Sequence, residues 1–270
     1  MFRPLRAYLL LILFLPVSLL TGCKSPPPVP QSSSEDEALK KFMDTSPREG
    51  KLVFLGVAGI RSRRQESIDL ALEDAARRVA VFHEVEGEFS TLSNRGGRLL
   101  DYRAETNASL NYDGAYKNYL ESLEFDQDTD VLESENAVFI RARYPGSLAI
   151  DFPPSIQGPD GKPFWIETPP AMIGDYTVGV GYAGRRNAHR DTVTASYENA
   201  VFSIIRNLSA VAWVQSFDYR GVGFLAIASG SVQRLDASAC LNEFYVLDTW
   251  TDPADKSVWT LAIAKEAGEP

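Results

Sequence analysis

The segment Gly179 to Gly184 has the clearest chemical pattern in the chain, because its glycines match G-x-G-x-x-G. In a dinucleotide site this pattern joins a strand to a helix that begins at the glycines, and the backbone amides bind the pyrophosphate. Here residues 185–187 intervene before the expected helix, and Glu198, the acid at nearly the required distance, lies within that helix. The pattern therefore predicts close packing of a strand against a helix and no nucleotide cofactor.

Metal ligands do not occur at the required spacings either. His83 and His189 fall in different expected helices, with no cysteine or carboxylate at zinc-ligand spacing. The segment Asp126 to Asp130 resembles the opening of a calcium loop. However, Val131 stands at the sixth position and Ala137 at the twelfth, where glycine and glutamate are needed. We expect a solvated acidic hairpin there and no bound metal.

Candidates for catalysis are sparse. Glu73 and Glu198 occupy matched positions of the repeat described below, but neither has a visible base or nucleophile as a partner. Cys240, at the start of an apolar run, is expected to be a buried small residue, with pairing between chains as the alternative. No catalytic residue is predicted, and we expect that the protein is not an enzyme.

Two clusters of arginines lie where the chain approaches each expected helix. The clusters comprise Arg61, Arg63, Arg64, Arg185, Arg186 and Arg190. The helix dipole disfavours cations at this end, so the clusters are unusual in a chain with a formal net charge of −9. One interpretation is a pair of patches that face a lipid headgroup, a cell-wall polymer or an acidic partner protein. The alternative is a solvated turn whose arginines pair with nearby carboxylates.

These residues belong to a pattern that occurs twice, 125 positions apart. Aligned without a gap, the two copies match at Val178, Gly181, Ala183, Gly184, Arg186, Glu198 and Ala200, which fall on Val53, Gly56, Ala58, Gly59, Arg61, Glu73 and Ala75. Repetition at a fixed period indicates that one structural unit was duplicated. Each copy is expected to contain a strand, a tight turn and a long helix. The turns are assigned to the glycines Gly56, Gly59, Gly179, Gly181 and Gly184.

Local signals define the strand and the helix of each copy. The first copy predicts a strand at 52–55 and a helix that runs from a capping box at Ser62 and Gln65 to about residue 84. The second predicts a strand at 176–181 and a helix capped by Asn187. Both helices carry one apolar stripe, formed by Ile68, Leu72, Ala75, Val79 and Phe82 and by Val193, Tyr197, Ala200, Ile204 and Leu208. Each stripe is expected to cover a sheet.

Further strands complete each copy. They are predicted at 99–111, 116–125 and 137–144, and in a closing hairpin of 244–250 with 257–264. Residues 146–162, rich in proline and glycine, form a linker. The predicted fold is therefore α+β, with two tandem modules at 49–145 and 163–267. Each module is a long helix packed on a mainly antiparallel β-sheet.

The amino-terminal residues carry an export signal. Two arginines precede an apolar run of 14 residues, 7–20, which is too short to span a bilayer as a helix. The run ends in Leu20-Thr21-Gly22-Cys23, which resembles the lipobox of bacterial lipoproteins. Residues 1–22 are therefore predicted to be a cleaved lipoprotein signal peptide. The resemblance implies that Cys23 becomes the first residue and carries acyl chains such as palmitate, which hold the protein to a membrane.

The next residues, 23–48, are rich in proline and then polar and acidic, and they predict a disordered tether. Position 24 is Lys24 instead of the aspartate that marks inner-membrane retention in many Gram-negative lipoproteins. The resemblance therefore implies the outer membrane, and we favour its periplasmic face over the cell surface. An acidic chain without a global basic surface is not expected to bind nucleic acid.

Short motifs mark the second copy. It begins with Pro163-Phe164-Trp165-Ile166 and Pro169-Pro170, continues through a Gly-x-Gly-Tyr-Ala segment, and closes with Trp250-Thr251-Asp252-Pro253. In this order the motifs resemble the LPP-twenty-like family of bacterial envelope lipoproteins, which are akin to flagellar outer-membrane and flagellar-assembly lipoproteins. The first copy lacks the Pro-x-Trp opening and the Trp-x-Asp-Pro hairpin, so its assignment to the family depends on the repeat.

The resemblance implies a lipid-anchored, non-catalytic protein of the cell envelope. Such a protein would bind other envelope proteins, or further copies of itself, in outer-membrane or flagellar structures. Two alternatives stay open at this point. One is a periplasmic enzyme or small-ligand binder that uses the segment Gly179 to Gly184, and the other is a surface-exposed adhesin or antigen.

Overall fold

The computed structural model describes residues 34–47, 49–96, 101–112, 114–134, 136–148, 150, 158, 161–209, 211–220 and 227–267. The predicted signal peptide 1–22, the lipidation site Cys23 and most of the linker 146–162 lie outside the described residues. Residues from Ser32 onward form one compact unit.

The elements of this unit follow in the order α1 (Ser34–Phe42), β1 (Lys51–Gly59), α2 (Arg64–His83), β2 (Val85–Gly96), β3 (Asp101–Tyr112), η1 (Gly114–Tyr116), α3 (Lys117–Leu120), β4 (Val131–Glu133), β5 (Ala137–Pro145), η2 (Phe164–Ile166), β6 (Met172–Ile173), β7 (Tyr176–Ala183), α4 (His189–Ser209), β8 (Val211–Arg220), β9 (Ile227–Thr251) and β10 (Val258–Glu266). All strand pairs between these elements are antiparallel. The α+β fold class is confirmed.

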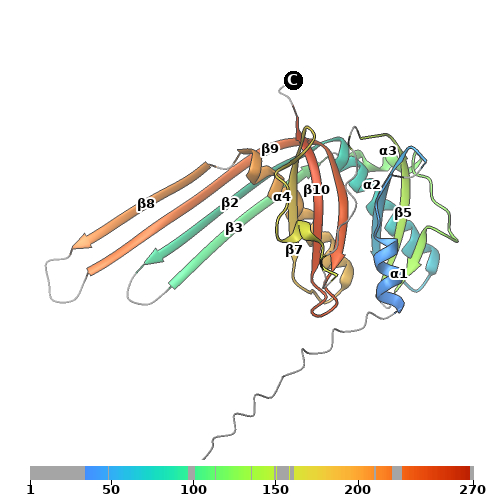
Figure 1. Cartoon of the computed structure of the whole chain (residues 1–270), viewed down its shortest axis with the longest axis horizontal. Coiled ribbons are helices and arrows are strands. Elements are labelled where there is room, and N and C mark those ends of the chain that lie inside the picture. The colour runs from blue at the N-terminus through green and yellow to red at the C-terminus, as the bar shows by residue number, and fades with distance from the viewer. Residues whose placement is uncertain are drawn as a thin grey trace, which may run out of the picture. The chain divides into compact units, whose positions relative to one another are not determined.

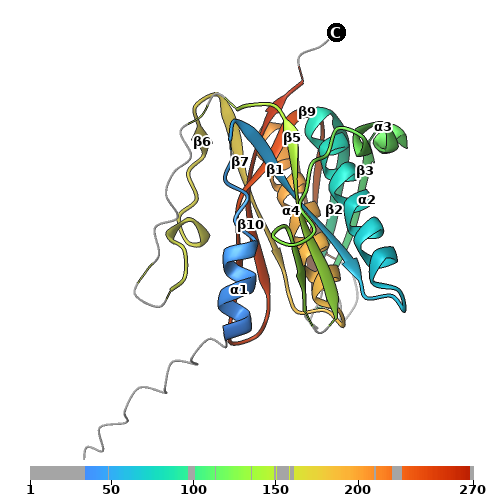
Figure 2. The same cartoon turned by 90° about the vertical axis from the view of Figure 1, so that its right-hand side faces the viewer.

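The strands form two sheets. One has three strands in the order β1-β5-β4, and the other has the order β3-β2-β9-β10-β7-β6, with β8 paired to β9. Helix α2 packs on β1 and β5, and α4 packs on β7, β10, β9 and β2. Figure 2 shows both helices running along the strands. The buried cluster that contains Phe54 and Ile68 also contains Tyr176 and Leu261, so one core spans both predicted modules.

Strand β9 joins two parts of the larger sheet. Its first half pairs with β2 on one edge and with β8 on the other, and its second half pairs with β10. Leu241 pairs with both Val85 and Glu266, so β10 lies on the edge opposite β2. The four strands β8, β9, β2 and β3 together are called the arm. They run side by side, and part of their length extends beyond the helix-covered part of the unit (Figure 1).

The backbone of β9 changes direction where it changes partners. Glu243 has φ 52°, a left-handed conformation that is uncommon for a residue with a side chain. The register with β10 shifts here, between Ile263 and Lys265, as in a β-bulge. Tyr176 donates its hydroxyl hydrogen to the Glu243 carboxylate, and Lys265 Nζ lies 2.9 Å from the same carboxylate. These contacts hold the bend in place.

The order of the elements repeats. The pairs β1 and β7, α2 and α4, β2 and β8, and β3 and β9 each begin 125 or 126 residues apart. This recurrence supports the predicted duplication. The two predicted modules are nevertheless not separate packing units, because β2 of the first pairs with β9 of the second along twelve positions, from Val85↔Leu241 to Gly96↔Gly230.

The turns assigned to the glycines are wrong, whereas the predicted strand at 176–181 and the predicted close packing of this strand against a helix are confirmed. Gly56 and Gly59 lie within β1, Gly179 and Gly181 lie within β7, and Gly184 directly follows β7. A Cβ atom on Gly56 would stand 2.0 Å from the carbonyl oxygen of Ala71 in α2, and a Cβ on Gly181 would stand 1.9 Å from that of Ser196 in α4. Each strand therefore approaches its helix so closely that no side chain fits between them.

The predicted helix caps also need correction. Arg63, not Ser62, is the N-cap residue of α2 and makes no side-chain cap bond, and Gln65 donates to Asp69 instead. Helix α4 begins at His189, two residues after Asn187. In both loops a buried hydroxyl in the first turn of the helix accepts a backbone N–H: Ser67 from Arg61 at 2.7 Å, and Thr192 from Arg186 at 3.0 Å.

Other boundaries differ from the predictions. Part of the predicted tether forms α1, and Phe42 at its end and Met43 directly after it are buried in one cluster with Leu55 and Val258. The run predicted as a strand at 116–125 contains η1 and α3. Strands β2 and β8 were not predicted.

Candidate functional site

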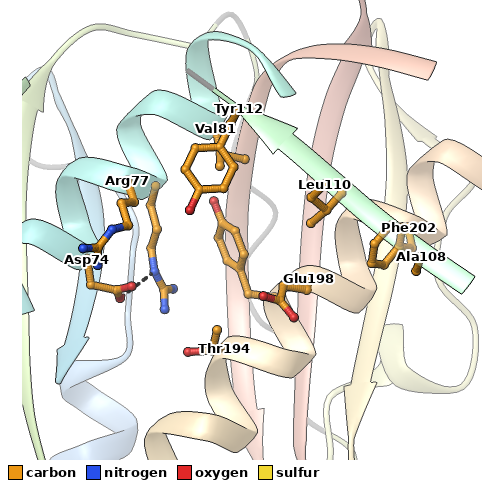
Figure 3. Close-up of a pocket in the computed structure, with 11 residues that line it drawn as sticks. Asp74, Arg77, Val81, Ala108, Leu110, Tyr112, Thr194, Glu198 and Phe202 are labelled. Carbon is orange, nitrogen blue, oxygen red and sulfur yellow. Dashed lines mark hydrogen bonds and ion pairs between the residues drawn. The ribbon is translucent and has the colours of Figure 1, made fainter. Parts of the chain in front are cut away.

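A pocket of about 370 Å³ lies between α2, α4 and β3 (Figure 3). Its lining residues are Asp74, Arg77, Arg78 and Val81 from α2, Ala108, Leu110 and Tyr112 from β3, and Thr194, Tyr197, Glu198 and Phe202 from α4. Steps of three and four residues place each helical set on one face of its helix. Steps of two place the β3 set on one face of its strand. Each element therefore presents its own set on one face, and the packing of the three elements brings the sets to a common space.

One side of the pocket is a fixed ion pair. Arg78 Nε lies 3.2 Å from Asp74 Oδ2, and the same Asp74 oxygen accepts the backbone N–H of Val57 at 2.9 Å. The guanidinium of Arg78 also lies over the ring of Tyr197, 4.6 Å from its centroid. The Arg78 side chain is only 8% exposed, so its charge is compensated by contacts within the protein.

Arg77, the second cation of the pocket, is also paired. Its Nη2 atom lies 3.2 Å from Glu73 Oε2, and its guanidinium lies over the Tyr116 ring at 4.7 Å from the centroid. The same nitrogen donates to the Tyr116 hydroxyl at 3.4 Å. These contacts orient Arg77 toward α3 and leave its stem at the pocket edge.

Glu198 differs from the other charged lining residues. Its carboxylate makes no ion pair with any residue of the described ranges. Burial raises the pKa of Glu198, and the charges of Arg186 and Arg78 oppose this rise from a distance. Tyr197, next to it, is buried, and burial raises its pKa so that the phenol stays neutral. The pocket therefore contains one carboxylate without a counter-charge in contact.

The arginine clusters are partly paired. Arg64 contacts the carboxylate of Glu133, and Arg190 lies 3.1 Å from Asp191 while its guanidinium covers Gly59 at the end of β1. Arg190 belongs to the second cluster, and Gly59 ends β1 just before Arg61 of the first cluster. The contact therefore places Arg190 beside the loop that carries the first cluster. The remaining four arginines are exposed and make no ion pair within the described ranges; they are Arg61, Arg63, Arg185 and Arg186.

The histidines and the acidic segment have structural contacts. His83 shares a 2.9 Å hydrogen bond with the Tyr144 hydroxyl, and its ring stacks on Tyr119. Burial lowers the pKa of His83. His189 packs near Phe139. Within the described part of the chain, no group of three or more acidic, histidine or cysteine side chains is placed to hold a metal ion.

Asp130 of the acidic segment is buried. It lies 3.4 Å from Arg141 and 3.2 Å from Arg143 on the neighbouring strand β5, so it anchors the segment to the sheet. Cys240 was expected to be buried, but it is partly exposed, with its sulfur 3.9 Å from Glu84. Burial and the adjacent carboxylates of Glu84 and Glu86 raise the pKa of this thiol.

The glycines that suggested a nucleotide site are covered. A Cβ on Gly179 would stand 2.6 Å from the carbonyl oxygen of Ala200, and Gly181 is closer still to α4. No space is left there for a phosphate group. Sequence reasoning missed the pocket, although one signal was present: Glu73 and Glu198 repeat, but Arg77 is replaced at the matched position by Phe202.

None of the helices in the described ranges combines the length and the apolar composition needed to cross a membrane. Comparisons of the chain with protein-family models, with curated proteins and with solved structures find no match.

Proposed function

We propose that the chain is a lipid-anchored, non-catalytic protein of the bacterial cell envelope that assembles with further copies of itself through the edges of the arm. The membrane attachment rests on the lipobox-like segment that ends at Cys23. The observation that carries the assembly is the arm, whose outer strands β3 and β8 each pair with only one neighbour among the described strands.

An unpaired strand edge is a template for another strand. Strand β3 has 12 residues and β8 has 10, so each edge presents a row of backbone N–H and C=O groups long enough for stable pairing. Proteins that stay monomeric shorten, bend or cover such edges. No described element covers either edge of the arm, and pairing with another copy would satisfy both.

The strand directions favour one mode of pairing. Because the arm has four antiparallel strands, β8 and β3 run in opposite directions at its two edges. The β3 edge of one copy can therefore pair with the β8 edge of the next in the antiparallel mode that links the strands within the arm. Every copy then keeps the same orientation, as a shared membrane attachment requires. Pairing of like edges would instead turn alternate copies end for end.

Such head-to-tail contacts close into rings or extend as filaments. They are consistent with an envelope scaffold, which needs no catalytic group. The alternative of a nucleotide-using enzyme loses its site, since α4 covers Gly179 and Gly181. The open edges of the arm thus support the assembly, and the contact between β7 and α4 argues against a nucleotide site at Gly179 and Gly181.

The arm proposal is tested with adjacent proline substitutions in β3. Successive residues of a strand direct their N–H groups to opposite edges, so one of Thr106→Pro and Asn107→Pro removes a bond to β2 and the other removes only an outer group. We expect one variant to lose stability and the other to keep it while losing assembly. Light scattering of the purified lipoprotein in detergent measures assembly, and thermal unfolding measures stability.

The direction of pairing is tested with cysteines in a Cys240→Ser background. Thr106→Cys marks β3, Ser216→Cys marks β8, and a short bismaleimide joins thiols that lie close together. Head-to-tail pairing predicts cross-linked dimers only when the two variants are mixed. Dimers within each variant alone would contradict this mode, and a monomer at all concentrations would contradict the proposed function.

A further inference from the structure

The pocket between α2 and α4 has two kinds of wall. Val81, Leu110 and Phe202 supply apolar surface, whereas Asp74 and Arg78 form a paired polar side (Figure 3). A volume of about 370 Å³ lies within the range of small-molecule sites, which combine apolar walls with a few polar groups. The pocket is therefore suited to a ligand with an apolar body and one polar end.

The charges of the pocket decide the sign of that polar end. Arg78 is balanced by Asp74, and Arg77 is balanced by Glu73, in each case at 3.2 Å. Glu198 adds a negative charge that no cation contacts within the described ranges. The four charged lining residues sum to zero, but Arg77 is already neutralised by Glu73, which lies outside the lining. Once both ion pairs are set aside, the exposed carboxylate of Glu198 is the charge that a ligand can pair with, and a monocation complements it.

The repeat explains why Glu198 has no partner cation on its own helix. In α2, Glu73 lies one turn before Arg77 and pairs with it. In α4, the matched residues are Glu198 and Phe202, so an aromatic ring stands where the first helix has its cation. A carboxylate beside an aromatic ring is a favourable setting for an ammonium group, which gains both an ion pair and a cation–π contact.

Arg186 makes no ion pair within the described ranges, and it is one of two arginines whose charge acts on Glu198. It lines a second, shallower hollow that also contains Glu198, and its charge acts on this carboxylate without a contact between the two. An ammonium group in the pocket would approach Glu198 from the other side, next to Phe202. Arg186 would then compete with the ligand instead of assisting it.

We propose that this pocket binds a small primary amine with an apolar or aromatic body, and that Glu198 contacts the ammonium group. Val81, Leu110 and Phe202 enclose the apolar body. The charged residues of the site belong to the two long helices, whereas Leu110 belongs to β3 of the arm, so the pocket borders the arm. The binding proposal does not depend on assembly through the arm.

Calorimetric titration of the full-length protein with three probes of equal chain length tests the site. The probes are hexylamine, hexan-1-ol and hexanoate, which differ in the charge of the polar end. We expect hexylamine to bind most tightly, hexan-1-ol more weakly and hexanoate not at all, and the rise in unfolding temperature at equal probe concentration to follow the same order. Equal or tighter binding of hexanoate would overturn the proposal.

Matched variants locate the site. Glu198→Gln is expected to weaken hexylamine binding about fivefold, and Phe202→Leu is expected to weaken it about threefold without a change of charge. Glu66→Gln makes the same charge change in the first turn of α2, away from the pocket, and should leave binding unaltered. Arg186→Gln should leave hexylamine binding equal or tighter. Unchanged binding in Glu198→Gln, with unfolding as in the parent, would refute the assignment.

Discussion

The two strand–helix units, β1 with α2 and β7 with α4, share their backbone contacts. In each, a strand glycine touches a helix carbonyl: Gly56 faces Ala71, and Gly181 faces Ser196. In each, a hydroxyl of the first helical turn binds the N–H of a loop arginine. All these positions are 125 residues apart. The two units thus share the close contact between the backbone of the strand and the backbone of the helix.

The polar side chains of the two units differ. Asp74 accepts the N–H of Val57 in the first unit, whereas the matched Asn199 donates to the carbonyl oxygen of Tyr182 at 2.8 Å in the second. The link between helix and strand is kept, but the direction of the hydrogen bond is reversed. Asp74 also borders the pocket. This difference between the units therefore lies at the border of the pocket.

The shared contact can be broken at either unit. Gly56→Ala and Gly181→Ala would each force a methyl group against a backbone oxygen, which cannot move without displacing the helix. We expect each substitution to lower the free energy of unfolding by about 3 kcal/mol or more in urea titrations. Gly184→Ala is the control, since its nearest neighbour would be the Tyr182 hydroxyl at 3.6 Å. Losses of very different size at the two sites would show that the units are not equivalent.

The reversed hydrogen bond can be exchanged between units. Asp74→Asn removes the ion pair of the nearly buried Arg78 and should cost about 2 kcal/mol. Asn199→Asp replaces a donor with a carboxylate that faces the Tyr182 carbonyl, and should cost about 1 kcal/mol because this site is exposed. Chemical denaturation of both variants measures the costs. An equal loss in both would contradict the different roles assigned to these residues.

The carboxyl-terminal ends of α2 and α4 differ in a way that we expect to have the smallest effect on stability. His83 ends α2, whereas the matched residue of α4 is Leu208. Because burial lowers the pKa of His83 below its ordinary 6.5, the unfolded chain takes up the proton first as the pH falls. The contribution of His83 to the free energy of unfolding is therefore present above pH 6.5 and is lost as the pH falls below it. Unfolding of the parent and of His83→Leu across pH 7.5 to 5 measures this, and an unchanged pH dependence in His83→Leu would exclude His83 as its source.

The sequence predicted the helices better than their surroundings. Apolar stripes such as that of Ile68, Leu72 and Ala75 depend only on local periodicity, so both long helices were found nearly to the residue. Gly56 was mistaken for a turn residue because a small residue selected for packing has the same local signature as one selected for a turn, whereas Gly181 was correctly placed in a strand that packs closely on a helix.

Long-range features were harder to predict. Strand β2 is polar along much of its length and is defined by its pairing with β9, which lies about 150 residues later in the chain. The pocket requires α2, α4 and β3 to converge, and no local pattern encodes this. The unequal residues Arg77 and Phe202 were visible in the aligned repeat, but their significance depends on that convergence.

Strand β9 has a mechanical consequence for any assembly built on the arm. Among the described arm strands, β9 is the one that also pairs with β10, so a load on the arm passes along the covalent peptide bonds of β9 into this pairing. The load crosses the left-handed residue Glu243, which Tyr176 and Lys265 brace. A force applied to the arm would therefore act on the backbone at Glu243, where the contacts with Tyr176 and Lys265 resist a change in the bend.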